Sequence, residues 1–363
     1  MGLDLNKTTD QKWDQTIFNQ PQWPKFRWKP KFLAQDLTLL AEEEKLLSNK
    51  LLYIDDAPLD ELYKICLYEE LVNSFCLDDE FIDPALVKSA LSQKSLAAAP
   101  ASPKNLNYGF GAGHLELINN YINLGLDARA NPEKRLSKRR LERWSRALAQ
   151  PGSLAGLGSW RAPSFGLKVS RPGSRPYSLT ASPAPEATKI PAEMGRFINW
   201  HNAPWPSDLV LKAGIAHLWL LIIQPFLVGS GRVARLATDL ALSSRGRICG
   251  FYSLSRAILL DRENYHEILS ATIEKPDLDI TAFLSFFTRM VLKSAQVANS
   301  RLDLIINKTA RWAKTKQRAL TKDQQNVLAS LWQDVGPLTP YGSPQTWPQA
   351  AHNSNDRLQA PWI

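Results

Sequence analysis

The chain has 363 residues, of which 44% are hydrophobic, enough for one large domain or two moderate ones with a substantial core. Its net charge is +9, but much of the excess lies in residues 134–146 and 301–318, which we interpret as helices with basic, solvated faces, so nucleic acid is not expected as a partner. We find no basic-then-apolar leader and no apolar run of bilayer length, so we expect a cytoplasmic protein without membrane contact. The three cysteines do not have the spacing of metal ligands.

The first third of the chain has the pattern of a helical subdomain. An aromatic and proline-rich arm covers residues 1–30. Apolar residues at intervals of three and four then predict helices over Leu37–Leu52 and Leu59–Phe75. An acidic stretch follows over residues 74–84, and residues 92–107, rich in Ala and Pro, predict a connection to the next part.

The middle of the chain alternates helical patterns with one long loop. Helical periodicity returns over Gly113–Ala128 and Leu136–Leu148, whereas Gly152–Pro185 is rich in Gly, Pro and Ser. Leu209–Ile223 is apolar almost throughout and has the length of a buried helix. Beyond residue 337 the chain has little periodicity, and we expect a mobile tail.

A glycine loop follows the apolar helix, where residues 224–235 have the sequence QPFLVGSGRVAR. Two glycines let the backbone approach a ligand closely, and the N-terminus of the next helix adds partial positive charge. Arg232 and Arg235 are three residues apart and so share one helix face. Taken alone, the loop fits a structural turn as well as an oligophosphate site. The residues that would contact phosphate are Gly229, Ser230, Gly231, Arg232 and Arg235.

This run resembles the signature of Fic (Fido) domains, H-P-F-x-[D/E]-G-N-G-R-x-x-R, and the resemblance covers roughly residues 20–300. It matches at Pro225, Phe226, Gly229, Gly231, Arg232 and Arg235. The resemblance implies an all-α fold, with a helical core, a β-hairpin flap and an N-terminal helical subdomain. The implied organisation is an N-terminal subdomain over 1–95, a Fido domain over 96–300 with its flap at about 160–182, and a helical extension with the tail over 301–363.

Three departures from the signature fall on its chemical positions. Active Fic enzymes usually transfer AMP from ATP to a protein hydroxyl, using the histidine as a base and the acid to hold magnesium. Here Gln224 replaces the histidine and has no titratable group near neutral pH. Val228 replaces the acid and offers no oxygen to a metal, so magnesium is expected to bind weakly or not to be used. Ser230 replaces the asparagine and can still hydrogen-bond a phosphate.

Two flanking segments resemble other parts of the family. Residues 74–84 resemble its inhibitory helix, in which an acid pairs with the second arginine of the loop; Ser74 and Asp78 fall on the matching positions, and an Asp78–Arg235 pair is the expected contact. An ordinary acidic turn before the next helix is an equally favoured interpretation of residues 74–84. Tyr265 and His266 match the wall that contacts the nucleobase, whereas His217 is expected to be a core histidine with satisfied hydrogen bonds.

The sequence is consistent with three functional hypotheses. The leading hypothesis is a Fic pseudoenzyme that binds ATP or another nucleotide, and a partner, without catalysis. The first alternative is a Fic-type transferase with altered chemistry, since a carboxylate or phosphate nucleophile needs no base at neutral pH. The second is a helical scaffold that binds no nucleotide. A protein target at the flap and a homodimer are both left open by the sequence.

Overall fold

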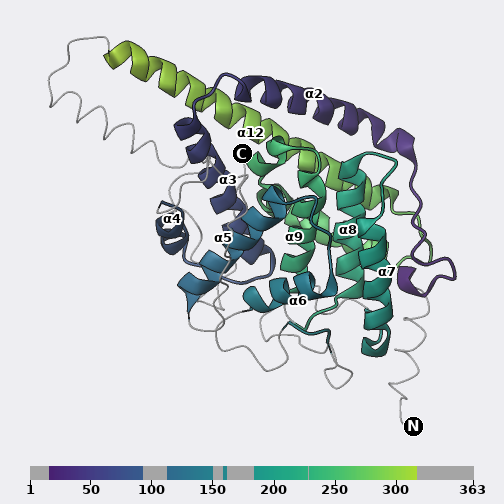
Figure 1. Cartoon of the computed structure of the whole chain (residues 1–363). Helices are drawn as coiled ribbons and strands as arrows, with labels where there is room; N and C mark the ends of the chain where they lie inside the picture. The colour runs from purple at the N-terminus through teal and green to yellow at the C-terminus, as the bar shows by residue number, and fades with distance from the viewer. Residues whose placement is uncertain (1–15, 93–112, 150–157, 162–183, 228, 317–363) are drawn as a thin grey trace, which may run out of the picture. The chain divides into compact units, whose positions relative to one another are not determined.

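The computed structural model describes residues 16–92, 113–149, 158–161, 184–227 and 229–316, and in these residues the protein is helical (Figure 1). The predicted β-hairpin flap lies mostly outside them, as do Val228 and the predicted tail. Within the described residues, sheet-type pairing is limited to one isolated parallel bridge between Arg27 and Asp279. None of these helices is both long and apolar enough to cross a lipid bilayer.

The α-helices are, in chain order, α2 (Ala34–Leu51), α3 (Asp56–Leu77), α4 (Pro84–Ser92), α5 (His114–Ala130), α6 (Lys138–Ala147), α7 (Ile190–Asn202), α8 (Leu209–Ile223), α9 (Ser230–Ser243), α10 (Leu254–Leu259), α11 (Arg262–Ile273) and α12 (Thr281–Lys316). Short 3-10 helices cover Ile17–Asn19, Pro30–Phe32, Ala187–Lys189 and Arg247–Phe251. The five helices predicted from periodicity correspond to α2, α3, α5, α6 and α8, so the all-α prediction is confirmed. The acidic stretch begins inside α3, because that helix continues to Leu77.

The chain divides into two compact units, residues 1–307 and 308–363. The first unit therefore contains both the N-terminal helices and the core around α8 and α9. Of the second unit, the structure describes only the last turns of α12, which end at Lys316.

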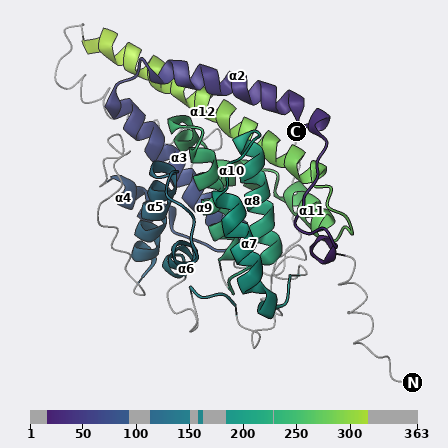
Figure 2. The same ribbon diagram turned by 45° about the vertical axis from the view of Figure 1, so that its right-hand side comes forward.

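Helix α8 is the centre of the first unit, with α9 beside it and α5, α6 and α7 around the pair (Figures 1 and 2). Thirteen of its fifteen residues are buried, which explains why its sequence is apolar on all sides. The helix begins at an N-cap in which the carboxylate of Asp208 accepts a 2.8 Å hydrogen bond from the Val210 amide. It ends at Gln224, whose left-handed backbone (φ 46°) turns the chain into the glycine loop.

Helix α2 runs along α12 on the outside of this core (Figure 2). The Lys50 ammonium lies 2.8 Å from the Asp303 carboxylate, and the Asn299 amide donates to the Glu43 carbonyl at 2.8 Å. The aromatic arm before α2 packs on α7 and α8, where the ring of Trp23 lies 5.9 Å from that of Trp219. The N-terminal segment is therefore part of the same packed unit as the site.

Gly214 lies where α8 packs tightly against side chains of α12. A methyl group at this position would lie 2.9 Å from side-chain carbons of Leu284 and Phe287. We expect Gly214→Ala to lower the free energy of unfolding by about 1–3 kcal/mol, because a tightly packed core must shift to admit it. Gly195→Ala in α7 is the control, since no atom lies within 4 Å of its added methyl. That variant should gain roughly 0.5–1 kcal/mol in the same urea titration, and an equal loss in both variants would contradict the packing argument.

Candidate functional site

The loop between α8 and α9 is fixed by backbone contacts on its first half. Arg161 donates through Nε to the Gln224 carbonyl at 2.8 Å, and its own amide donates to the Pro225 carbonyl at 2.9 Å. The same guanidinium also contacts the Ile223 and Pro185 carbonyls. Because the last carbonyls of α8 lack partners within the helix, this buried arginine serves as their cap.

The second half of the loop leads directly into α9. Gly229 has φ 79°, a conformation that favours glycine, and Ser230 is the first residue of the helix. The Ser230 hydroxyl accepts from the Phe226 amide and donates to the Phe226 carbonyl, both at 3.0 Å. A phosphate that used this hydroxyl as a donor would therefore replace the bond to the Phe226 carbonyl.

Arg232, the first arginine of the motif, is fully buried and paired with an acid that the pattern analysis did not single out. Its Nη1 and Nη2 atoms lie 2.7 and 3.2 Å from the two carboxylate oxygens of Glu80. The Nε atom is 3.4 Å from a carboxylate oxygen of Asp78, and the guanidinium lies 4.8 Å from the centre of the Phe75 ring. This bidentate geometry is that of a strong arginine–carboxylate pair.

Arg235 is held by the end of α3. Its Nε and Nη2 atoms each lie 2.7 Å from an oxygen of Ser74, the hydroxyl and the carbonyl respectively, and Nη2 lies 2.9 Å from a carboxylate oxygen of Asp78. The expected Asp78–Arg235 pair is thus present, while the inhibitory role of Ser74 and Asp78 stays a prediction. Burial is the largest single influence on Arg235 and opposes its charged form, but the charge and hydrogen bond of Asp78, together with Tyr121 and Tyr265, outweigh it and raise the pKa of the guanidinium.

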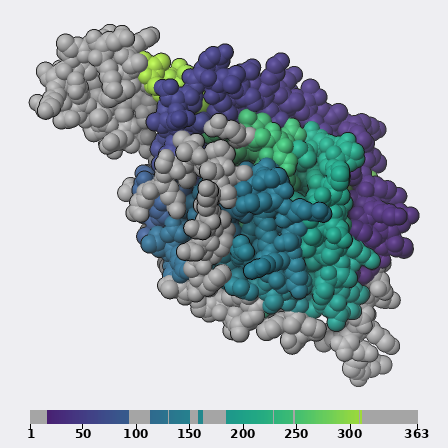
Figure 3. Space-filling view, viewed as in Figure 1, coloured from purple at the N-terminus to yellow at the C-terminus, as the bar shows by residue number. Residues whose placement is uncertain are grey.

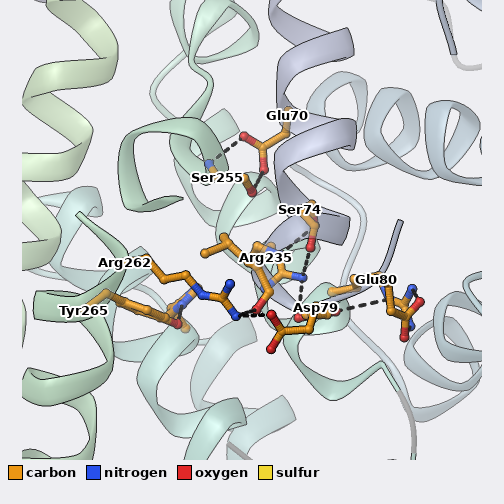
Figure 4. Close-up of polar contacts among 12 residues, drawn as sticks. Glu70, Ser74, Asp79, Glu80, Arg235, Ser255, Arg262 and Tyr265 are labelled. Carbon is orange, nitrogen blue, oxygen red and sulfur yellow. Dashed lines mark hydrogen bonds and ion pairs between the residues drawn. The ribbon is translucent and has the colours of Figure 1, made fainter. Parts of the chain in front are cut away.

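A third pair completes the cluster. Asp79, two residues after the end of α3, has φ 56°, and its carboxylate lies 2.8 Å from Nη2 of Arg262 on α11. The Asp78 carboxylate lies over the backbone of Gly231, so close that a methyl group there would be 2.9 Å from it. We call Asp78, Asp79 and Glu80 the acidic latch, because the three carboxylates join the end of α3 to α9 and α11 (Figure 4).

The predicted nucleobase wall is buried beneath this cluster. Tyr265 is 3% exposed, and its hydroxyl lies 2.9 Å from Nε2 of His217, whose Nδ1 lies 3.0 Å from the Thr238 hydroxyl. His217 is therefore a core histidine with both ring nitrogens hydrogen-bonded, as predicted. His266 is 8% exposed and accepts from Nε of Arg262 at 3.2 Å. A base-stacking role for Tyr265 and His266 stays a prediction.

Glu70 lies on α3, one turn before Ser74, and anchors that helix. Its carboxylate accepts hydrogen bonds from the amide and hydroxyl of Ser255 on α10 (Figure 4). Burial raises the pKa of Glu70 to about 7, with a further contribution from the charge of Asp239. The contact holds α3 against α10 and so fixes the position from which Ser74 and the latch reach α9.

Four site residues were missed by pattern reasoning: Arg161, Glu80, Arg262 and Glu70. Glu80 had a usable signal, because it lies in the same acidic run as Asp78. Arg161 lies in the segment predicted as the flap, but its role as a cap of α8 had no signal, because a single arginine in a Gly- and Pro-rich segment is common on protein surfaces. In the described residues, no group of three or more His, Cys, Asp or Glu side chains is placed to hold a metal ion.

Comparison with known proteins agrees with this fold. Residues 135–242, which include the glycine loop, match the model of the Fic/DOC family, and residues 16–95 match a domain of unknown function (DUF4172). No curated protein matches the chain.

Two solved structures share the fold at low sequence identity. A Fic family protein from Desulfovibrio desulfuricans G20 is 17% identical, with a TM-score of 0.54 over 73% of this chain and 74% of that one. A Fic domain containing signaling protein from Bacteroides thetaiotaomicron VPI-5482 is also 17% identical, with a TM-score of 0.50 over 74% of this chain and 98% of that one. The helical fold is that of Fic-family proteins. The chain therefore contains a Fic/DOC-family domain over residues 135–242.

Proposed function

We propose that this Fic-domain protein binds the phosphates of a nucleotide at the N-terminal turn of α9, and that it does so as a pseudoenzyme whose site opens when the acidic latch releases its arginines. The observation that carries the proposal is the pairing of both motif arginines, Arg232 and Arg235, with carboxylates of one short segment. The carboxylates of Asp78 and Glu80 occupy the guanidinium groups that an anionic ligand at the N-terminus of α9 would have to contact.

Charge and geometry support an anion as the ligand. Two buried guanidinium groups at the N-terminal turn of α9 contact the same carboxylates, and the absence of a side chain at Gly231 lets the Asp78 carboxylate, itself an anion, lie against the backbone there. With Asp78 and Glu80 in place the two arginine charges are neutralised. A nucleotide therefore competes with the latch, and its apparent affinity is reduced by the fraction of molecules in which the latch is closed.

The chemistry of the loop supports binding over transfer. Gln224 cannot take a proton near neutral pH, and its carbonyl is held by Arg161. His217 is no substitute, because both of its ring nitrogens are hydrogen-bonded in the core. The valine at position 228 offers no oxygen to magnesium, so these two positions of the motif provide neither the base nor the metal ligand of an active member.

Opening the latch should strengthen nucleotide binding. We expect Asp78→Asn with Glu80→Gln to bind a fluorescent ATP analogue at least about tenfold more tightly than the wild type, since each replaced carboxylate removes a charged competitor worth about 1.5–3 kcal/mol. Arg235→Ala should abolish binding in both backgrounds. Fluorescence anisotropy titration without and with magnesium measures these affinities.

A matched pair of exposed acids provides the control. Glu42→Gln with Asp56→Asn makes the same change of net charge away from the site and should leave the affinity at the wild-type value. Equal tightening in that variant, or unchanged binding in Arg235→Ala, would place the nucleotide elsewhere. Transfer of label from α-labelled ATP to protein by the wild type would show an active transferase and overturn the pseudoenzyme part of the proposal.

A further inference from the structure

Helix α6 carries the strongest local charge in the described chain. Between Asp127 and Arg146 there are eight cationic side chains and three acidic ones, and most of the cations are exposed. The cationic side chains are those of Arg129, Lys134, Arg135, Lys138, Arg139, Arg140, Arg143 and Arg146. Arg129 is buried in an ion pair with Asp239. We call the other seven the cationic face of α6; five of them lie on the helix, and Lys134 and Arg135 lie just before it.

Acids of the same chain pair with three members of this face. Asp127 contacts Arg140 at 3.0 Å and Lys134 at 3.8 Å, and Glu142 contacts Lys138 at 3.7 Å. The first turn of α6 contains no acid, although a helix N-terminus favours one. Like charges four residues apart, such as those of Arg139 and Arg143, also weaken a helix. An anionic partner would relieve the repulsion between such neighbouring cations.

The cationic face continues to the motif loop through residues 158–161. The Lys138 ammonium lies 6.0 Å from the centre of the Trp160 ring, and that ring lies 5.1 Å from the ring of Phe226 in the motif. The next residue, Arg161, bonds to the Pro225 carbonyl. Figure 3 shows blue atoms of the segment that contains α5 and α6 on the side of the molecule turned to the viewer.

We propose that the cationic face of α6 docks an acidic protein segment, one rich in Asp or Glu, and so guides it toward the motif loop. A protein segment is favoured over nucleic acid because Trp144, the aromatic residue of α6, is 1% exposed and the neighbouring Trp160 ring packs on Phe226, so neither is a free platform for base stacking. The inference extends the proposed function by giving the chemistry of its partner. It replaces the interpretation of this face as merely solvated.

The probe is a short fluorescein-labelled peptide that alternates glutamate and serine, with a glutamine–serine peptide of equal length as the neutral control. Anisotropy should show saturable binding of the acidic peptide that weakens with added salt. Arg135→Glu with Arg139→Glu should weaken it about tenfold or more, since two attractions become repulsions. Both arginines are exposed and outside the core, and Arg135→Gln with Arg139→Gln is a second variant with a smaller expected loss.

Lys45→Glu with Lys88→Glu is the charge-matched control, because both lysines are exposed on other helices. Equal weakening in this control would overturn the proposal, since binding would then depend on net charge alone. Absence of binding by the acidic peptide, equal binding of the neutral peptide, or tighter binding of an oligonucleotide duplex of equal charge would also overturn it. Nucleotide affinity is measured in the same samples, so a failure at α6 is distinguishable from a failure of the nucleotide site.

Discussion

Replacing Glu80 with alanine is expected to lower the free energy of unfolding by about 3–5 kcal/mol, because it leaves the Arg232 guanidinium buried without its bidentate partner. The arginine is fully enclosed by the protein, so water cannot replace the lost carboxylate. Asp78 retains only a 3.4 Å contact with Nε, and it also serves Arg235. Urea unfolding followed by far-ultraviolet circular dichroism measures the loss.

This variant also links stability to the proposed ligand. If an oligophosphate takes the place of the Glu80 carboxylate, then triphosphate should restore part of the lost stability, by an amount that rises with its concentration. Arg232→Met with Glu80→Leu should lose much less than Glu80→Ala, because an apolar pair of similar size removes the unpaired charge.

The matched control is the exposed pair between Lys50 and Asp303. Its atoms approach to 2.8 Å, yet the Asp303 side chain is 52% exposed, so Asp303→Ala should cost no more than about 0.2–1 kcal/mol. A loss of similar size at Glu80 would show that Arg232 does not depend on the latch, and would remove the basis for a competition between latch and ligand.

The helical fold was predictable because α8 and its neighbours carry strong periodic signals. An apolar run from Leu209 to Ile223 has no other stable place than the centre of a helical unit. The end of that helix was marked as well, since the loop that follows contains two glycines. By contrast, the boundary of the first unit at Asn307 falls inside α12, where no change of composition marks it.

The candidate site was predictable only where the motif itself lies. Arg232 and Arg235 could be placed on one helix face from their spacing, and Asp78 could be assigned to Arg235 by resemblance. The partner of Arg232 is set by the path of the chain after α3, where the left-handed turn at Asp79 redirects the backbone and brings Glu80 onto α9. A single positive φ at a residue that is not glycine leaves no sequence signal strong enough to predict that path.

Acidification gives the second large effect, and it arises from buried neutral histidines. Burial lowers the pKa of His217 to about 3, with a smaller contribution from the Arg235 charge. It lowers the pKa of His201 to about 4, where the charges of Lys212 and Arg140 add to it. The unfolded chain, with histidine pKa values near 6.5, binds more protons than the folded one below that pH. Stability contributed by these residues is therefore present above about pH 6.5 and lost as the pH falls.

Glu70 changes the pH dependence of stability in the opposite direction. Its folded pKa of about 7 exceeds the usual value of a glutamate, so the folded protein binds more protons between those values and gains stability as the pH falls. Because the two effects partly cancel, the pH dependence of the wild type alone does not isolate the histidines. A variant that removes one histidine and keeps its polar contacts separates them.

We expect His217→Gln to flatten the acid side of the stability curve. Glutamine can still hydrogen-bond Thr238 or Tyr265, but it takes up no proton, so the wild type should lose about 2 kcal/mol more than the variant between about pH 7 and pH 5. Urea titrations at both pH values give the difference. His114→Gln, at an exposed position at the start of α5, should follow the wild type. If His217→Gln also follows the wild type, the ring is protonated in the folded core, and the neutral hydrogen-bonded link between Thr238 and Tyr265 beneath the motif arginines does not hold.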